Sequence, residues 1–185
     1  MLPFPRKAAQ VPADSGTAQA QQPVYHESFE DGVPEYFRAT RPGSLSTSQR
    51  HSKEGRSSLR WDWFRGEELV IRRGIGDPSR VGGYRCRACF AVWVYVEQPV
   101  PDALVFEFRE GENPTGSFRF PLAFTGWRQG RPYYHAFPQG QPTSRVDNIR
   151  ITATTRVAGG TVFLDLVKYN TLTYGGNAII PEKEA

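Results

Sequence analysis

The sequence contains few of the features that mark several large classes of protein. Its 185 residues include only two cysteines, Cys86 and Cys89. A structural zinc site needs a second cysteine pair or a histidine pair at suitable spacing, and the three histidines are scattered. We therefore expect both cysteines to be small strand residues. A domain of about 150 residues buries roughly 70% of its unfolded surface, so it needs no disulfide for stability.

Long apolar runs and common catalytic motifs are missing as well. The longest apolar run, Ala88 to Val96, is far shorter than the ~20 residues of a membrane helix, so no membrane partner is expected. There is no phosphate loop, no Gly-x-Ser-x-Gly elbow and no His-Glu-x-x-His pair. The acidic residues Glu107, Glu110 and Glu112 lie around a turn, which argues against a glycosidase carboxylate pair.

Lysine is scarce, while arginine is abundant. The chain has 19 arginines and four lysines, and its net charge is +4 at pH 7. The planar arginine fork binds carboxylate, sulfate or phosphate through two parallel hydrogen bonds, which makes polyanions candidate partners. A GC-rich genome would produce the same bias on a solvated surface, and this alternative stays open. No helical or RNP-type motif accompanies the arginines, so nucleic acid is not expected.

The first 22 residues show neither helical nor strand periodicity, and we predict that 1–22 is a disordered leader. The run Thr17–Ala20 has the small-residue form of a secretory cleavage site, although no apolar segment precedes it. We interpret the leader as the remnant of a secretion signal, with chance similarity as the alternative. This interpretation predicts a secreted or periplasmic bacterial protein.

Residues 23–170 are predicted to form one all-β domain of two antiparallel sheets, because short β-type runs alternate with Gly, Pro, Asn and Asp. In the run Leu59–Trp63, alternation places Leu59, Trp61 and Trp63 on one face, which we assign to the core. The run Ala88–Val96 is apolar on both faces, which predicts a central strand covered on both sides. Gly159-Gly160 is predicted to form the hairpin turn between the last two strands, Val146–Thr152 and Thr161–Tyr169.

Five local motifs occur in a fixed order. They are Ser28-Phe29-Glu30-Asp31-Gly32, then Gly55 to Trp63, then Phe90 to Pro99, then Phe124-Thr125-Gly126-Trp127-Arg128, and finally Val146 to Ile151. This series resembles the N-terminal domain of chondroitin sulfate ABC lyases, bacterial polysaccharide lyases that degrade chondroitin and dermatan sulfate. The resemblance covers roughly residues 24–169.

The resemblance implies a jelly-roll β-sandwich of the galactose-binding-like, carbohydrate-binding kind. In such lyases this domain precedes a helical toroid that holds the catalytic residues. We therefore expect residues 171–185 to be a linker toward an absent catalytic domain, and we expect no catalysis by this chain alone. The parent protein is expected to be a polysaccharide lyase that acts by β-elimination. Two functions follow from this: a monomeric, non-catalytic module that binds sulfated or uronic-acid-containing polysaccharide, or a structural domain that packs on the catalytic domain without binding sugar.

The resemblance also implies a structural cation. Many jelly-roll domains hold one through backbone carbonyls and carboxylates from an N-terminal segment, a loop and a late strand, and calcium accepts such oxygen ligands. Carried onto this sequence, the ligands are Ser28, Glu30, Glu54, Ser57 and Asp147. Calcium is expected, with sodium as the alternative ion. The competing interpretation is a surface glutamate and a turn aspartate that accepts local backbone N–H groups.

Sugar-binding modules stack aromatic rings on sugar C–H surfaces, and acidic glycans also require arginine or lysine. Trp93 shares its strand face with Tyr95, and an aromatic and basic stretch begins at Trp127. The candidate glycan contacts are Trp93, Tyr95, Trp127, Arg128, Arg131, Tyr133, Tyr134 and His135. Docking on the catalytic domain is the alternative role of the stretch that begins at Trp127.

Overall fold

The protein is an all-β sandwich, seen here in a computed structural model that describes residues 26–72, 88–132, 146–154 and 156–172. The strands are β1 (His26–Glu27), β2 (Phe37–Ala39), β3 (Leu45–Ser48), β4 (Ser58–Phe64), β5 (Glu68–Ile71), β6 (Ala88–Val96), β7 (Ala103–Glu110), β8 (Asn113–Pro121), β9 (Gly126–Gly130), β10 (Asn148–Ala153) and β11 (Gly159–Leu172). The described residues contain no helix, and so none long and apolar enough to cross a membrane. The predicted leader 1–22 and most of the predicted linker lie outside the described residues.

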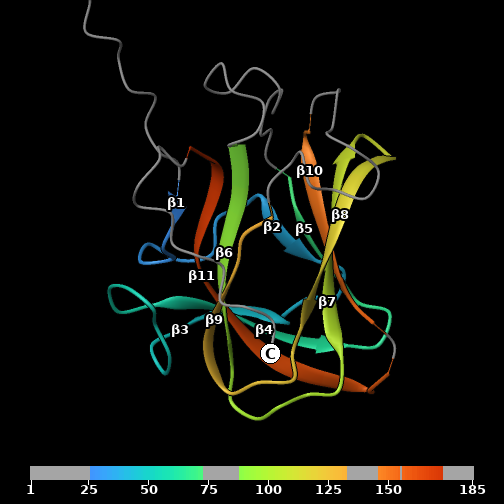
Figure 1. Ribbon diagram of the computed structural model, residues 1–185. Coiled ribbons are helices and arrows are strands. Elements are labelled where there is room, and N and C mark those ends of the chain that lie inside the picture. The colour runs from blue at the N-terminus through green and yellow to red at the C-terminus, as the bar shows by residue number, and fades with distance from the viewer. Residues whose placement is uncertain (1–25, 73–87, 133–145, 155, 173–185) are drawn as a thin grey trace, which may run out of the picture.

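Two antiparallel sheets face each other (Figure 1). Sheet A has the order β3-β4-β11-β6-β9, and β1 also pairs with β11. Sheet B has the order β2-β5-β10-β7-β8. Strand β11 is the hub of sheet A, because β4 pairs with its first half, β1 with residues 167–168, and β6 with the other side. The predicted two-sheet antiparallel sandwich is therefore confirmed.

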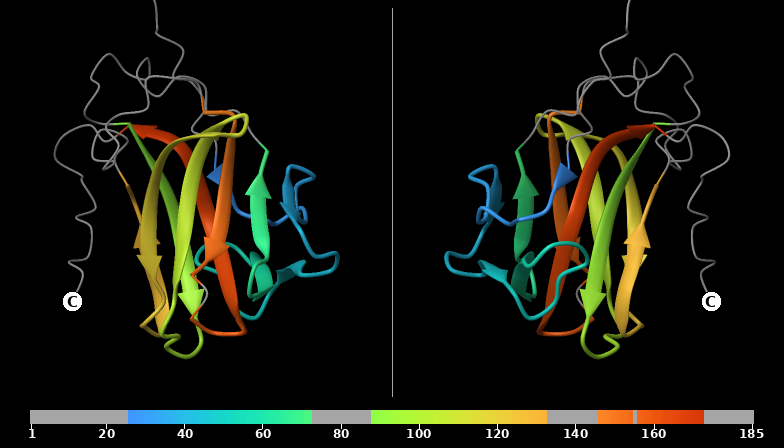
Figure 2. Two further views of the ribbon diagram at one scale, coloured as in Figure 1. Left: turned by 90° about the vertical axis from the view of Figure 1, so that its right-hand side faces the viewer. Right: turned by 90° about the vertical axis from the view of Figure 1, so that its left-hand side faces the viewer.

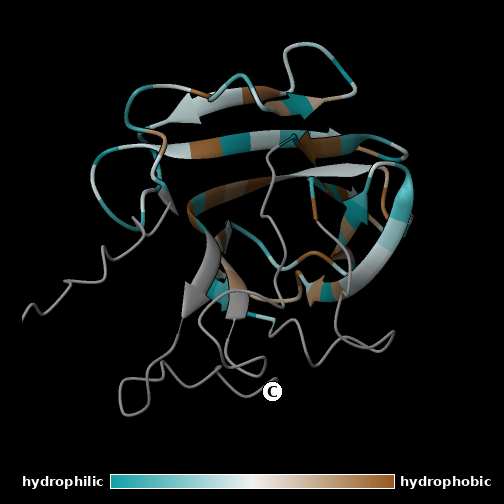
Figure 3. Ribbon diagram, turned by 90° about the horizontal axis from the view of Figure 1, so that it is seen from above, coloured by the Kyte–Doolittle hydropathy of each residue, from teal (hydrophilic) through white to brown (hydrophobic). Residues whose placement is uncertain are grey.

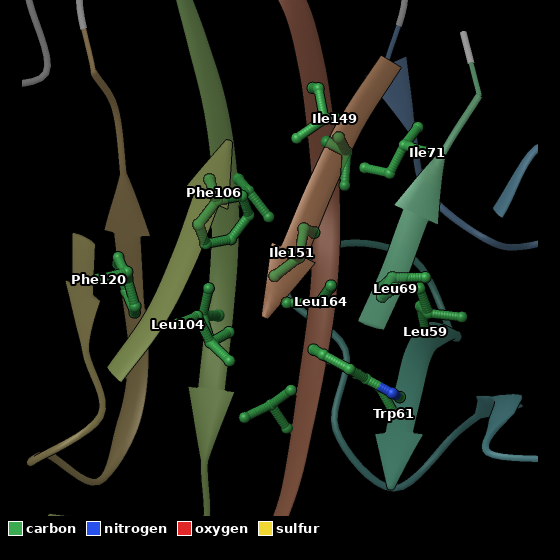
Figure 4. Packing of buried hydrophobic residues seen from close by; sticks show 14 of the residues in the cluster. Leu59, Trp61, Leu69, Ile71, Leu104, Phe106, Phe120, Ile149, Ile151 and Leu164 are labelled. Carbon is green, nitrogen blue, oxygen red and sulfur yellow. The ribbon is translucent and has the colours of Figure 1, made fainter. Parts of the chain in front are cut away.

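The core lies between the inner faces of the two sheets, and side chains from both meet there (Figure 4). Because successive side chains on a strand point to opposite faces, hydrophobic and hydrophilic residues alternate as bands along the strands (Figure 3). Leu59, Trp61 and Trp63 of β4 are at most 1% exposed, which confirms their assignment to the core. On β7, the inward residues are Leu104, Phe106 and Phe108, all fully buried.

Strand β6 is covered on both faces, as its apolar sequence predicted. It lies between β11 and β9. Its residues Val92 and Val94 pack in the core, while Trp93 and Tyr95 point to the outer side of sheet A. A segment that precedes β4 covers this outer side, as described below.

The predicted hairpin at Gly159-Gly160 is wrong. Strand β10 pairs with β5 and β7 in sheet B, whereas β11 pairs with β4 and β6 in sheet A, so the connection crosses between sheets. Both glycines already belong to β11, where they pair with Phe64 and Trp63. A Cβ on Gly159 would lie 2.5 Å from the Trp63 carbonyl oxygen, and one on Gly160 would lie 2.9 Å from the Trp63 ring. These glycines permit close packing rather than a turn.

The close approach at Gly159 predicts a stability effect. In Gly159→Ala the added methyl group meets backbone, which cannot move as a side chain can, so we expect a loss of about 1–3 kcal/mol in the free energy of unfolding. The exposed neighbour Ala158 provides the control, because Ala158→Ser should change stability by less than about 0.5 kcal/mol. Urea unfolding measures both effects. Equal midpoints for Gly159→Ala and the parent would contradict the packing argument.

Candidate functional site

The segment between β3 and β4, residues 49–57, crosses the outer face of sheet A, and we call it the strap. The His51 ring stacks on Tyr95 with 3.9 Å between ring centroids. The Lys53 Nζ lies 3.9 Å from the centroid of the Trp93 ring. In Figure 1 the strap is the loop between β3 and β4 on the side of sheet A that faces away from sheet B. The strap therefore covers the outward aromatic side chains of β6.

A buried carboxylate fixes the middle of the strap. Asp165 of β11 is fully buried, and its Oδ2 accepts hydrogen bonds from the backbone N–H groups of Lys53 at 2.7 Å and Glu54 at 3.2 Å. The other oxygen, Oδ1, accepts one from the backbone N–H of Leu166 at 2.7 Å. A buried charge requires such donors, because burial removes its hydration. The backbone of the strap thus replaces water around Asp165.

A second carboxylate fixes the end of the strap. The Glu30 Oε1 accepts hydrogen bonds from the backbone N–H groups of Arg56 and Ser57, both at 2.9 Å. Gly55 lies between the two anchored parts with φ of +68°, and a Cβ there would lie 2.4 Å from the same oxygen. Only glycine fits this position without displacing Glu30.

A β-bulge positions Asp165. Asp165 pairs with Trp93, but the next pair is Lys168 with Ala91, so three steps on β11 match two steps on β6. Within the bulge Leu166 has φ of +48°, an uncommon left-handed conformation for a branched residue. The extra residue returns Val167 to the core while Asp165 faces the strap.

A left-handed residue lies next to Glu30 as well. Phe29, which directly precedes Glu30, has φ of +60°. Left-handed residues thus flank both carboxylates, and such strain is typical of ligand sites.

The two carboxylates influence each other electrostatically. Burial raises the pKa of Asp165, the hydrogen bonds from Lys53, Glu54 and Leu166 lower it, and the negative charge of Glu30 raises it. The pKa of Glu30 is lowered, first by the backbone hydrogen bonds from Ser57 and Arg56. The site therefore holds two acidic groups that repel each other, one of them buried.

The structure places four of the five predicted cation ligands on two segments that a hydrogen bond between Glu30 and Ser57 joins. Ser28 and Glu30 follow β1, and Glu54 and Ser57 lie on the strap that Glu30 binds. Asp147 is not part of this group: it precedes β10 in sheet B, and its carboxylate accepts hydrogen bonds from the Gly111 N–H at 3.0 and 3.1 Å. Its place beside the strap is taken by Asp165, which our sequence reasoning missed. The available signal was a lone acid in the apolar run 162–167.

These residues fit a cation only in combination with backbone oxygens. Within the described ranges, no group of three or more His, Cys, Asp or Glu side chains is arranged to hold a metal ion. The two carboxylates are hard oxygen ligands of the kind that calcium accepts, and a calcium ion would need backbone carbonyl oxygens in addition. A cation would also offset the repulsion between Glu30 and Asp165.

The predicted glycan contacts Trp93, Tyr95 and Trp127 lie close together on the outer face of sheet A. Tyr95 pairs with Trp127 of β9, and their ring centroids are 5.3 Å apart. However, Lys53 covers Trp93 and His51 covers Tyr95, so these two rings pack against protein. Trp127 lies on the edge strand and is half-buried.

The remaining predicted glycan contacts do not join this aromatic group on the outer face of sheet A. Arg128 is exposed and alternates to the other face of β9, where its Cζ lies 4.9 Å from the centroid of the Phe124 ring. Arg131 directly follows β9 and is half-buried. Tyr133, Tyr134 and His135 lie outside the described residues.

The outer face of sheet B is charged. Arg109 of β7 forms ion pairs with Glu107 and with Glu112. Arg150 of β10 forms ion pairs with Glu112 and with Glu68. Glu107 and Glu112 are thus partners of arginine on this face.

Solved structures share this fold at low sequence identity. A family 16 carbohydrate-binding module has a TM-score of 0.52 at 10% identity, covering 82% of this chain and 99% of that chain. A family 22 carbohydrate-binding module of Clostridium thermocellum has a TM-score of 0.50 at 14% identity, covering 80% of this chain and 93% of that one. These similarities show that the fold is a carbohydrate-binding-module type of jelly roll.

Curated relatives and a family match identify the chain more closely. The chondroitin sulfate ABC exolyase of Bacteroides thetaiotaomicron is 34% identical over 125 residues, which is 65% of this chain and 12% of the relative. The exolyase of Proteus vulgaris is 29% identical over 139 residues, 75% of this chain and 14% of the relative. The chain thus spans a small part of these relatives. Residues 25–174 match the family described as "Lyase, N terminal". The chain therefore belongs to the lyase N-terminal domain family, which it shares with the chondroitin sulfate ABC lyases.

Proposed function

We propose that this domain is a non-catalytic module that binds an acidic glycosaminoglycan of the chondroitin sulfate type and positions it for a lyase. The observation that carries the proposal is the family match over residues 25–174, together with relatives named as chondroitin sulfate lyases. The carbohydrate-binding-module fold supports it. The arginine content supports it as well, because uronate and sulfate groups suit the guanidinium fork.

The proposal includes a parent lyase. The curated relatives are about seven to eight times longer than the matched segment, since it covers 12% and 14% of them. We propose that β-elimination beside a uronic acid is carried out by residues outside this chain. A secreted or periplasmic setting belongs to the proposal, because the polymer is met there.

A structural domain that packs on the catalytic part without binding sugar is the second candidate. The supporting observation is Phe64, the one large apolar side chain that is exposed among the described residues, at 55%. The Arg41 Cζ lies 4.4 Å from the centroid of its ring. A single ring is a small contact compared with a stable interface, so sugar binding remains the leading proposal.

Retention on immobilised polysaccharide tests the leading proposal. We expect the domain to be retarded by chondroitin sulfate or hyaluronan at low salt and released as salt increases, because screening weakens interactions between exposed charges. A neutral xylan matrix is the control and should not retard the protein in a salt-dependent way. Failure to bind any glycosaminoglycan at low salt would leave the structural role as the better account.

We further propose that Glu30 and Asp165, with the carbonyls of Ser28, Glu54 and Ser57, hold a structural calcium ion, sodium being the alternative. The proximity of two carboxylates and the burial of Asp165 support this. A bound calcium would neutralise the charge that burial disfavours. It would stabilise the strap, because both carboxylates also accept hydrogen bonds from the strap.

Thermal unfolding with calcium and with EDTA tests the ion. At a free calcium concentration of 100 times Kd, we expect stabilisation of about 2.7 kcal/mol, seen as a higher Tm than in EDTA. Glu30→Gln should lose this difference, since its amide oxygen can still accept the strap N–H bonds while the charge is removed. Asp147→Asn is the matched control and should retain it. An unchanged Tm of the parent in EDTA, with no co-purified metal, would refute the cation.

A further inference from the structure

The outer face of sheet B carries two arginines that come from neighbouring strands. Strands β7 and β10 pair in the register Arg109 with Asn148 and Glu107 with Arg150. Because Phe108 and Ile149 point into the core, Arg109 and Arg150 point outward. In the left view of Figure 2, sheet B faces the reader, with β7 and β10 side by side in it. The two guanidinium groups are therefore diagonal neighbours on one surface.

One carboxylate joins the two arginines. The Glu112 Oε2 lies 3.2 Å from the Nη2 of Arg109 and 3.2 Å from the Nη2 of Arg150. The side chains of Arg109 and Arg150 are only 11% and 29% exposed, whereas that of Glu112 is 85% exposed. The guanidinium groups are thus held against the sheet, and their shared carboxylate stands in solvent.

Each arginine retains an unused donor. Among the residues that the structure describes, the buried Nε atoms of Arg109 and Arg150 have no hydrogen-bond partner. The Nε of Arg150 lies 3.5 Å from the Glu68 Oε2, close enough for an ion pair but without hydrogen-bond geometry. Buried donors are normally satisfied, so these two atoms show that the neighbouring carboxylates do not use every donor of the two guanidinium groups.

We propose that Arg109 and Arg150 form an oxyanion site for a carboxylate or sulfate group of an acidic glycan, and that Glu112 occupies this site in the free protein. The inference rests on the proposed function. A carboxylate already bridges the two guanidinium groups, so the site accepts an oxyanion. Exposed ion pairs such as those of Glu112 are weak, which allows an external anion to displace it. Sulfate and uronate groups match the guanidinium fork equally well.

The turn that carries Glu112 does not depend on its carboxylate. Arg109 also donates a hydrogen bond to the backbone carbonyl of Glu112. The Gly111 N–H donates to Asp147, and the Asn148 side chain donates to the Gly111 carbonyl at 3.0 Å. The Glu112 side chain can therefore move into solvent while the β7–β8 turn remains in place.

Further arginines extend the site along the sheet. Val70 pairs with both Arg38 and Arg150, which places the two arginines in one row across three strands. Arg119 of β8 is exposed and pairs with Val105. Glu68 and Glu107 reduce the positive potential near the site, so we expect weak binding of a single oxyanion rather than strong binding of any polyanion.

Binding of chondroitin sulfate and of unsulfated chondroitin at fixed ionic strength tests the site. We expect Glu112→Ala to tighten binding about two- to fivefold, because the internal competitor is removed. Arg150→Gln should weaken binding about tenfold, since a charge-assisted hydrogen bond is lost. Glu110→Ala is the matched control: it removes the same charge beside the same turn, at the end of β7, but Glu110 forms no ion pair with either arginine among the described contacts.

The outcomes separate this site from the proposed function. Tighter binding of unsulfated chondroitin by Glu112→Ala would assign the bound group to uronate. Tighter binding of the sulfated polymer alone would assign it to sulfate. Both results support the site. The site would be overturned if Glu112→Ala and Glu110→Ala changed binding equally, or if folded Arg150→Gln bound as well as the parent. In either case, binding of the polysaccharide by the parent would still support the proposed function.

Inorganic sulfate provides a test that does not depend on glycan binding. If the parent binds no glycosaminoglycan, the proposed function fails, and the Tm in sulfate against chloride at equal ionic strength then decides the site. If sulfate raises the Tm of Glu112→Ala more than that of Glu110→Ala, the oxyanion site is supported. Equal rises would overturn it.

Discussion

The buried carboxylate of Asp165 is the constraint on which the outer layer of the domain depends. Burial of a carboxylate is unfavourable unless donors surround it, and here the donors are backbone N–H groups of the strap and of the bulge. The strap must therefore lie across sheet A. That position in turn brings His51 onto Tyr95 and Lys53 onto Trp93. Since β11 pairs with β1, β4 and β6, its bulge links Asp165 to most of sheet A.

The two outer faces of the sandwich consequently differ in what they can bind. On sheet A the strap packs on the aromatic side chains of β6, and a flat sugar surface would have to displace it. On sheet B the outward residues Glu107 and Arg109 of β7 and Arg150 of β10 are charged, and the inward phenylalanines and isoleucines of these two strands are fully buried. A neutral sugar would find few stacking partners among these residues. An acidic sugar would find arginines.

The strands were predictable from sequence because side-chain alternation is a local property. Leu59, Trp61 and Trp63 alternate with polar residues, and their burial followed directly. The errors arose where distant segments determine the local structure. Gly159-Gly160 has the sequence of a turn, but Trp63 on another strand is what requires glycine there. Asp165 was missed because its partner Lys53 lies 112 residues away in sequence.

The cation prediction was likewise right about neighbouring segments and wrong where a distant strand was involved. The resemblance implied that the segments with Glu30 and with Ser57 lie together, and a hydrogen bond joins them. Asp147 was chosen because it precedes a late strand, but that strand belongs to sheet B. Sequence order cannot tell which sheet a strand joins. The lone acid in the apolar run 162–167 was visible in the sequence, but the segment that covers it was not.

The abundance of arginine becomes informative only when each guanidinium is compared with its partner. Arg41 is 44% exposed and its partner Glu67 is 4% exposed, so there the carboxylate is the fixed group and arginine covers it. Arg60 and Asp62 are similarly exposed, at 42% and 35%, as expected for a surface pair. At Arg109 and Glu112 the order is reversed, since the arginine is held and the carboxylate is free to leave. A protein that binds an external oxyanion requires this last arrangement, because the donors must stay in position when the internal anion departs.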